Sequence, residues 1–308
     1  MLNTSSYIYK ELKRRKVRVE LLNDDSALMR YRHNNQWHLL MGCVSEGTSR
    51  IASEICGNKA QSEYFARLAK LNVPSSCLYE SEEQAIEFMK QFDSIVVKPL
   101  DAAHGNGIST RVKTKTDLRK AIAAVRRYSK RPALLQEMVT GSDVRIMVID
   151  GKFVAAVRRV PPTVIGDGKH TVEKLIEMEN ENPMRTAGKR GRLKVISLEA
   201  ARSFLKRHIG RVPKEGEIVP VSGVSNTSMG GHAEDATDEI EPAVRRQAER
   251  FAKLLNLPVC GIDIMLNDDG SYYFIEANSQ PGFGPHHHPR VGKPRNVTKA
   301  FVDMVLAN

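Results

Sequence analysis

Alternating apolar and polar residues mark several expected strands along the chain. The stretch at 17–22 (VRVELL) has this pattern, and the stretch at 25–42 is expected to fold into a hairpin that turns at Asn34–Asn35. Two further runs at 143–159 flank Gly151, which predicts a second hairpin. Other strands are expected at 94–100, 108–114, 133–139 and 258–278. Antiparallel hairpins are therefore expected to build much of the sheet structure.

Helical periodicity lies between these strands. The stretch from about Ser49 to Leu71 predicts one helix that ends before Pro74 and has Ala60, Tyr64, Leu68 and Leu71 on one face. The stretch 117–129 predicts a helix that buries Leu118, Ala121, Ile122 and Val125. Other helices are expected at 171–180, at 197–210 with Ser197 as N-cap and Gly210 at its end, at 242–256, and at the end of the chain. The mixture predicts an α+β fold.

Composition narrows the class of protein. Of the 308 residues, 41% are hydrophobic and 27% are charged, as is usual for a globular protein that buries a large core. The net charge of +11 suits nucleotides or nucleic acid, but aromatic residues are only 6% and do not interleave with the basic clusters. A nucleic-acid partner is therefore not expected.

The cysteines and the first residues predict a cytoplasmic protein. The cysteines Cys43, Cys56, Cys77 and Cys260 form no CxxC pair and have no metal-site spacing, so reduced thiols are expected. The first residues (MLNTSSYIYKELKRRK) lack the apolar core of a signal peptide, and no run is long enough to cross a membrane. No membrane partner is expected.

Three oxygen-bearing side chains interrupt the apolar runs near the end of the chain. Glu276 and Asn278 are two residues apart, so both project from one face of a strand. If the hairpin closes through a two-residue Asp269–Gly270 turn, Asp263 lies directly opposite Glu276. Two carboxylates so close repel each other unless a cation lies between them, and a carboxamide oxygen completes a set that suits Mg²⁺ with nucleotide phosphates. A half-exposed sheet face is the alternative for these residues.

A lysine and a glycine-rich loop supply the expected phosphate side. Lys98 lies in the strand expected at 94–100, and the loop His104–Gly107 (HGNG) follows that strand. Backbone N–H groups approach phosphates most closely where side chains are absent, and the lysine adds a compact positive charge. An ordinary turn is an equal alternative for this loop taken alone. GDGKHT at 166–171 is not a Walker loop, because Thr163 occupies the first glycine position, and no GxGxxG opens a helix.

Together these motifs resemble the ATP-grasp superfamily. More narrowly, the chain is similar to the ATP-grasp modules of cyanophycin synthetases and of bifunctional glutathione synthetases. The matching stretches are 58–74, 96–109, 134–176, 226–238, 261–282 and 286–297. They cover most of residues 50–298, and their order and spacing make a chance similarity improbable.

The resemblance implies a role for each of several residues. It implies that Lys59 and Lys98 hold phosphates and that the loop with His104, Gly105 and Gly107 closes over ATP. It implies that the stretch with Gln136, Glu137 and Val139 lies against the adenine and that Asp143 holds the ribose. It implies that Arg159, with Lys98 and Asn278, serves the reacting phosphoryl group. It implies that Asp263, Glu276 and Asn278 bind Mg²⁺, with Mn²⁺ as an alternative metal. Arg145 is a further candidate near the phosphoryl group, or a surface arginine.

The family chemistry is the ligation of a carboxylate to an amine through an acylphosphate. The resemblance thus implies an ATP-dependent ligase that joins amino acids or small peptides, and a homo-oligomer, either a dimer or a tetramer. Because the chain shows neither the second ligase module of cyanophycin synthetase nor the leading ligase of the bifunctional glutathione synthetases, it is expected to act as a stand-alone ligase. The alternatives are a small-molecule kinase of the same superfamily and a non-catalytic nucleotide-binding protein.

The remaining candidates concern the substrates and the domains. Neighbouring histidines on a strand face opposite ways, so PHHHPR at 285–290 predicts a pocket loop rather than a metal site. The candidates for substrate contacts are Asn226, Ser228, Gly230, His286, His288, Arg290 and Arg295, of which the two arginines suit a carboxylate. Residues 1–57 are expected to form a short N-terminal α/β segment and 58–308 the ATP-grasp domain. That domain divides into 58–139, with the glycine-loop lobe at 94–139, and 140–308, with an insertion at about 161–235.

Overall fold

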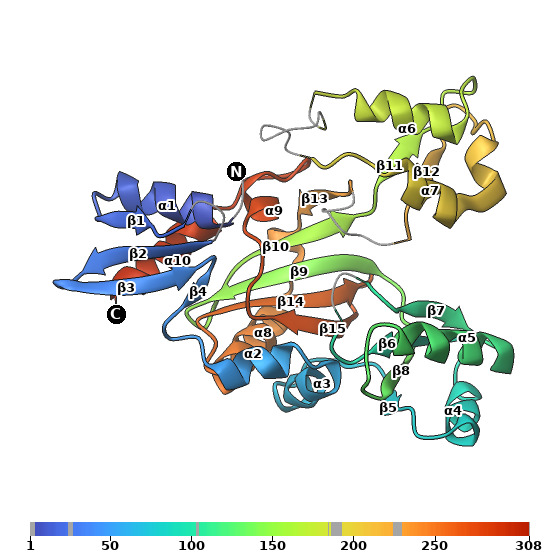
Figure 1. The fold of residues 1–308 in the computed structure, drawn as a ribbon, viewed down its shortest axis with the longest axis horizontal. Coiled ribbons are helices and arrows are strands. Elements are labelled where there is room, and N and C mark those ends of the chain that lie inside the picture. The colour runs from blue at the N-terminus through green and yellow to red at the C-terminus, as the bar shows by residue number, and fades with distance from the viewer. Residues whose placement is uncertain are drawn as a thin grey trace.

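A computed structural model describes residues 4–23, 27–102, 105–183, 185, 193–223 and 230–307 of the chain (Figure 1). Helices and antiparallel sheets are both present, so the α+β expectation is confirmed. No helix in these ranges is long and apolar enough to cross a membrane. The predicted site residues His104, Asn226 and Ser228 lie outside the described residues.

The central sheet has the strand order β13-β10-β9-β14-β15, and each neighbouring pair is antiparallel. Its strands are β9 (Ser142–Ile149), β10 (Lys152–Val160), β13 (His232–Asp235), β14 (Val259–Leu266) and β15 (Tyr272–Asn278). The β9–β10 hairpin turns at Asp150–Gly151, as the alternating pattern predicts, and both turn residues have positive φ. The predicted hairpin at 258–278 is likewise β14 and β15.

Helices cover one face of this sheet and shield its apolar residues. They are α2 (Arg50–Cys56), α3 (Lys59–Leu68) and α8 (Pro242–Leu254). Val144, Ile146 and Val148 of β9 alternate toward this face and pack with Phe251 of α8, which is fully buried. The long amphipathic pattern at 242–256 is thus explained by a single apolar stripe against the sheet.

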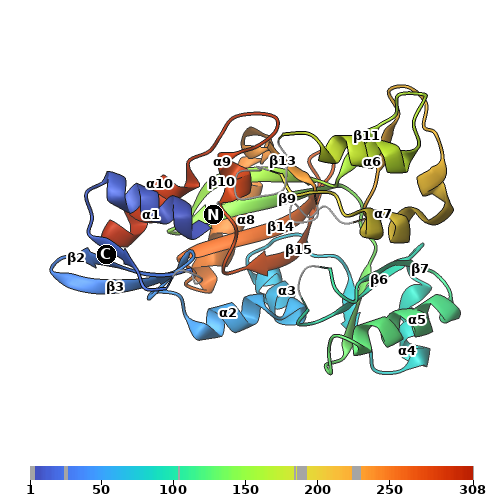
Figure 2. The same cartoon turned by 45° about the horizontal axis from the view of Figure 1, so that its top comes forward.

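The opposite face of the sheet is covered at one end by both ends of the chain. The covering elements are α1 (Thr4–Arg14), α10 (Val297–Ala307) and a sheet of β1 (Val19–Leu21), β2 (Leu28–His33), β3 (Gln36–Met41) and β4 (Val44–Ser45). The helices α1 and α10 lie side by side (Figures 1 and 2). The β2–β3 hairpin turns at Asn34–Asn35, both with positive φ, as predicted. The other end of this face carries the charged residues described below.

Two smaller units stand at the right-hand end of the central sheet in Figures 1 and 2. The first is a sheet with the order β5-β8-β6-β7. It contains β5 (Ser76–Leu78), β6 (Ile95–Pro99), β7 (Ser109–Val112) and β8 (Ala133–Glu137), with α4 (Glu82–Met89) and α5 (Lys115–Arg126) packed on it. The α5 helix buries Leu118, Ala121, Ile122 and Val125, as its periodicity predicts.

The second unit is the excursion of the chain between β10 and β13. It has its own apolar cluster and contains β11 (Thr163–Ile165), α6 (Val172–Asn180), α7 (Leu198–Leu205), η1 (Lys206–Gly210) and β12 (Ile218–Pro220). Ser197 caps α7 as predicted, but the α-helix ends at Leu205 and continues to Gly210 only as a 3-10 turn. The strand β13, inside the stretch predicted as an insertion, pairs with β10 in the central sheet. Two short helices, η3 (Thr237–Glu239) and α9 (Gly284–His287), follow it.

The single helix predicted from Ser49 to Leu71 is wrong in two respects. Gly57 ends α2, and the Asn58 side chain accepts the backbone N–H of Gln61 to begin a new helix, α3. The predicted apolar face is also largely turned outward, since Tyr64 is 61% exposed and Leu68 is 44% exposed, although Leu71, beyond the end of α3, is buried. The helix α3 buries Lys59, Ser62, Glu63 and Ala66 instead. Periodicity failed here because the face that α3 turns inward is polar.

Candidate active site

Charged side chains share one face of the central sheet. Arg145 of β9 lies opposite Asp263 of β14, and Asp263 lies opposite Glu276 of β15. Asp143, two residues before Arg145, projects from the same face of β9. The sheet therefore brings basic and acidic side chains from three strands next to one another on the same face.

The predicted pairing of Asp263 with Glu276 is confirmed, but the predicted turn is wrong. Asn267 pairs with Ser271, so the loop consists of Asp268, Asp269 and Gly270, with Gly270 at φ +82°. This loop shifts the pairing by one residue, and a bulge between Asp263 and Ile264 shifts it back. The shift from the loop and the shift from the bulge cancel. Asp263 therefore pairs with Glu276, as it would with a two-residue turn and no bulge.

Asp263 is the centre of an ion-pair network. Arg145 donates through Nε to Oδ1 at 2.7 Å and through Nη2 to Oδ2 at 2.8 Å. Arg159 of β10 donates to Oδ2 at 2.8 Å and also to Asp143 Oδ1 at 2.6 Å. Asp263 is only 1% exposed, so burial by itself raises its pKa, but the charges of Arg145 and Arg159 hold the pKa below its usual value.

Asp143 has a different electrostatic balance. Burial raises its pKa to about 6, and the charge of Arg159 only partly opposes this increase. Its carboxylate is bound to Arg159, so a ribose would have to share it with that guanidinium. The ribose role of Asp143 and the phosphoryl role of Arg159 stay predictions.

The predicted phosphate lysines come from the elements next to this sheet. Lys59, the first residue of α3, is 6% exposed, and its Nζ donates to the carbonyl of Ala102 at 2.8 Å and lies 4.0 Å from Glu276 Oε2. Lys98 of β6 is 3% exposed, and its Nζ donates to Gln136 Oε1 at 2.8 Å. A lysine from the α3 side and a carboxylate of the predicted metal site therefore face each other.

Burial changes the acidity of both lysines. It lowers the pKa of Lys59, against the charges of Glu276 and Asp101. It lowers the pKa of Lys98 to about 8, although Glu63 opposes the change. Lys98 is thus mostly protonated at neutral pH and loses its charge as the pH rises through about 8.

The stretch predicted to read adenine is anchored by strand contacts. Gln136 is 3% exposed, and its carboxamide is bonded to Lys98 and to Glu63. The Glu137 N–H donates to the Ser75 carbonyl at 2.9 Å, and the Glu137 carboxylate accepts the Ser75 N–H at 3.2 Å. Val139 follows the end of β8 and is partly exposed. The roles of Gln136, Glu137 and Val139 toward adenine stay predictions.

The glycine loop joins β6 to β7, which pair antiparallel as predicted. Gly105 and Gly107 have φ values of +80° and +73°, a region that other L-residues rarely adopt. A Cβ atom at Gly107 would lie 3.0 Å from Cδ2 of Tyr128. The positive φ therefore favours glycine at 107, and a Cβ atom there would also have to displace the exposed Tyr128 ring.

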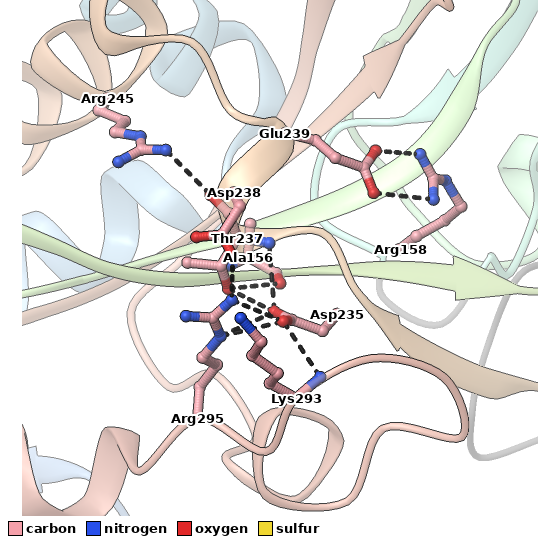
Figure 3. A network of polar contacts seen from close by, with 9 residues as sticks. All are labelled: Ala156, Arg158, Asp235, Thr237, Asp238, Glu239, Arg245, Lys293 and Arg295. Atoms are coloured by element: carbon pink, nitrogen blue, oxygen red, sulfur yellow. Dashed lines mark hydrogen bonds and ion pairs between the residues drawn. The ribbon is translucent and has the colours of Figure 1, made fainter.

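The residues predicted to contact substrate have contrasting surroundings. Arg290 is exposed, whereas the Arg295 guanidinium donates to Asp235 Oδ2 at 2.7 Å and to Asp238 Oδ2 at 2.8 Å (Figure 3). His288 is exposed, and Gly230 is buried, with its carbonyl accepting from Arg185. Because Arg295 already has carboxylate partners within the chain, a substrate carboxylate would compete with them.

His286 in α9 is fully buried, and neither ring nitrogen has a hydrogen-bond partner among the described residues. Burial lowers the pKa of His286 to about 3, and the charge of Arg145 adds to this effect. The imidazole is therefore neutral. Its substrate role stays a prediction.

The donor atoms suit the metal and nucleotide that the resemblance implies. Asp263, Glu276 and Asn278 offer only oxygen atoms, which fits Mg²⁺, and the lysines fit phosphates. Both oxygens of Asp263 accept guanidinium protons, and Asn278 Oδ1 accepts the Gln280 N–H at 2.8 Å, so Glu276 is the most accessible of the three. Within the described ranges, no group of three His, Cys, Asp or Glu side chains could hold a metal.

A cavity of about 600 Å³ lies elsewhere, between the N-terminal sheet, the β9–β10 turn, the end of α8 and α10. Tyr31, Glu46 and Lys253 are among its lining residues, and none of the predicted site residues is. The candidate site is therefore defined by the paired residues of the central sheet and the lysines beside it, and not by this cavity.

One buried polar residue of the site was missed by the sequence reasoning. Glu63 is 1% exposed and binds the carboxamide that holds Lys98. Apolar periodicity does not mark this residue. The signal in the sequence is the polar face of α3 that begins at Lys59.

Two domain families match the chain. Residues 63–173 match the ATP-grasp domain of prokaryotic glutathione synthetase, and residues 209–288 match the RimK-like ATP-grasp domain. Among solved structures, a D-alanine–D-alanine ligase from Bacillus anthracis shares the fold, with a TM-score of 0.52 at 14% identity over 84% of this chain and 69% of that chain. The chain belongs to the ATP-grasp superfamily.

Within that superfamily, the chain is similar to two kinds of synthetase. Cyanophycin synthetase from Nostoc sp. is 34% identical over 87% of this chain and 31% of that protein. A bifunctional glutathione biosynthesis protein from Mannheimia succiniciproducens is 30% identical over 94% of this chain and 41% of that protein. A bifunctional glutathione synthetase from Pasteurella multocida superposes with a TM-score of 0.71 at 27% identity, over 99% of this chain and 43% of that chain. The chain therefore spans only about a third to two fifths of these relatives.

Proposed function

We propose that this chain is an ATP-dependent carboxylate–amine ligase that forms an amide bond between amino-acid or small-peptide substrates. The observation that carries the proposal is the approach of Lys59 to Glu276, with Lys98 buried beside them and Asp263 opposite Glu276. Lysines suited to a triphosphate and carboxylates suited to Mg²⁺ thus lie close to one another. The relatives named for cyanophycin and glutathione synthesis support this reading.

The proposed reaction has two steps. A substrate carboxylate oxygen bonds to the γ-phosphorus of ATP as the bond to ADP breaks, which yields an acylphosphate and ADP. A substrate amine then bonds to the acyl carbon, phosphate leaves with the bonding electrons, and the amine loses a proton. Bound Mg²⁺ would offset the charge of the phosphates.

The side chains of this site contribute charge and position. In this proposal Lys59 and Lys98 neutralise the phosphates. Arg159, which is paired with Asp143 and Asp263, stabilises charge on the transferred phosphoryl group. The chain needs no nucleophile of its own for this reaction, because positioning and electrostatics supply most of the catalysis.

The test is a reaction with ATP and Mg²⁺ against a panel of amino acids and short peptides. Phosphate release and the mass of the product are measured together, and Mn²⁺ is compared with Mg²⁺. An acid–amine pair should yield ADP, phosphate and a product that is lighter by one water than the two substrates combined. A stable phosphorylated product without an amide would instead identify a kinase.

Lys98→Ala is expected to abolish turnover, whereas Lys130→Ala, at an exposed lysine of the same lobe, should leave it intact. Tight ATP binding with no stimulation by any acid–amine pair would refute ligation. Full activity of Lys98→Ala would refute the phosphate role of that lysine.

A further inference from the structure

A buried carboxylate lies behind the phosphate lysine Lys98. Glu63, in the second turn of α3, is 1% exposed. Glutamate is almost never buried so completely unless it has partners that satisfy it. Its position on the inward face of α3, one turn after Lys59, therefore calls for a functional or structural reason.

Both carboxylate oxygens of Glu63 accept hydrogen bonds from the sheet with the order β5-β8-β6-β7. Its Oε1 accepts Nε2 of Gln136 on β8 at 2.6 Å, and its Oε2 accepts the hydroxyl of Ser76 on β5. The carboxamide Oε1 of Gln136 in turn accepts Nζ of Lys98 on β6 at 2.8 Å. Lys98, Gln136 and Glu63 thus form a continuous hydrogen-bonded chain in which every member is at most 3% exposed.

The direction of this chain of hydrogen bonds follows from chemistry. An ionised carboxylate only accepts hydrogen bonds, so Gln136 must turn its NH₂ group toward Glu63. The carboxamide then necessarily turns its oxygen toward Lys98, and an ammonium group only donates. The charge of Glu63 therefore selects the one amide orientation that can hold the lysine.

The segment that follows α3 also contacts the central sheet. The Asn72 side chain, just after α3, donates to the Tyr272 carbonyl of β15 at 2.8 Å, and the Asn72 carbonyl accepts the Phe274 N–H. The segment that carries Glu63 is thus attached to the strand of Glu276 as well as to β5 and β8.

We propose that Glu63 is a positioning residue that acts through Gln136 to hold the Lys98 ammonium in place for the phosphates of ATP. This proposal rests on the proposed function only in taking ATP as the ligand of Lys98. It assigns to Glu63 no contact with ATP itself.

The electrostatics of the group agree with this geometry. Burial lowers the pKa of Lys98 to about 8, and the charge of Glu63 is the largest opposing effect. Lys59 on α3 lowers the pKa further, and Glu276 on β15 raises it. Without the charge of Glu63, Lys98 would lose its proton at a lower pH and would hold phosphate less well near neutrality.

The experiment measures ATP affinity by calorimetry between pH 6 and 9.5, in the presence of Mg²⁺ and without co-substrate. The wild-type affinity should fall as the pH rises through about 8. In Glu63→Gln the fall should begin about one pH unit lower, which corresponds to roughly threefold weaker binding at about pH 7.5. Glu63→Asp retains the charge, so its midpoint should lie closer to that of the wild type.

Ser76→Ala is the matched control, because it removes a hydrogen bond to the same carboxylate without changing any charge. Its midpoint should stay at the wild-type pH. Thermal unfolding of each variant shows whether it is folded. If Glu63→Gln does not fold, Glu63→Asp is compared with Ser76→Ala instead. The proposal then predicts that the pH midpoint of ATP binding is lower in Glu63→Asp than in Ser76→Ala.

Equal midpoints for the wild type and Glu63→Gln would overturn the proposal, as would an equal shift in Ser76→Ala. Failure of the proposed function has a different signature. In that case the wild-type chain itself would not bind ATP, or would bind it and ligate nothing, whatever residue stands at 63.

Discussion

Replacing Asp263 tests the ion-pair network directly, because the guanidinium groups of Arg145 and Arg159 both donate hydrogen bonds to this carboxylate. Asp263 is 1% exposed and accepts hydrogen bonds from Arg145 at 2.7 and 2.8 Å and from Arg159 at 2.8 Å. Asp263→Ala leaves the Arg145 guanidinium in a mostly buried place without its bidentate partner. Asp263→Asn keeps one carbonyl oxygen as an acceptor but removes the charge.

The expected loss of stability follows from the burial of this pair. Removing one partner of a buried ion pair costs about 3–5 kcal/mol, since the remaining charge stays buried without compensation. At about 2–4 °C per kcal/mol for a chain of this size, Asp263→Ala should lower the melting temperature by roughly 6–20 °C. Asp263→Asn should fall in the lower half of that range.

The assay is thermal unfolding in the presence of EDTA, so that metal binding does not contribute. The matched variants are Asp263→Leu, Arg145→Met and the double variant Arg145→Met/Asp263→Leu, which removes both charges and fills the space with apolar atoms. The double variant should be more stable than the sum of the single changes predicts, by about 1–3 kcal/mol. Strict additivity, or a melting temperature for Asp263→Ala within 2 °C of the wild type, would refute the reasoning.

Three further predictions concern residues around this network. Burial lowers the pKa of His286 to about 3, so the folded chain takes up this proton at a much lower pH than the unfolded chain, and stability should fall as the pH drops below about 6.5, by about 1.4 kcal/mol per pH unit from this group. Urea unfolding at pH 7, 6, 5 and 4 should show a slope shallower by one proton in His286→Phe, and an unchanged slope would contradict the assignment. Gly107→Ala forces a strained φ of +73° and a 3.0 Å contact with Tyr128, so it should cost about 1 kcal/mol and weaken ATP binding, whereas Gly210→Ala, with nothing within 4 Å, should do neither. Arg295→Met removes the contacts with Asp235 and Asp238 and should lower the melting temperature by a few degrees, while an unchanged melting temperature with a higher KM for the carboxylate substrate would favour the substrate role predicted from the sequence.

Local patterns predicted the elements whose inward faces are apolar. The helix α5 buries Leu118 and Val125 as expected, because a stripe of apolar residues at helical spacing has one favourable way to pack on a sheet. The same reasoning failed in α3, where Tyr64 is exposed and Glu63 is buried. That face is turned inward by hydrogen bonds to other elements, which a pattern of hydrophobicity does not encode.

The pairing of Asp263 with Glu276 was predicted for an incomplete reason. The rule for a two-residue turn is local, but the bulge that restores the register at Ile264 depends on how β14 fits between β9 and β15. The partners of Asp263 could not be predicted in the same way, because Arg145 and Arg159 are 118 and 104 residues distant along the chain.

The sequence by itself determined the α+β class, the hairpins, the superfamily, and the residue types that suit ATP and Mg²⁺. These depend on spacing within a few residues, or on the order of motifs along the chain. Only the tertiary structure decided that two arginines hold Asp263, that Lys59 approaches Glu276, and that Glu63 lies behind Lys98. The physical reason is that burial and charge pairing join groups from different sheets, and the strength of each pair depends on the distances and on the loss of water that folding brings about.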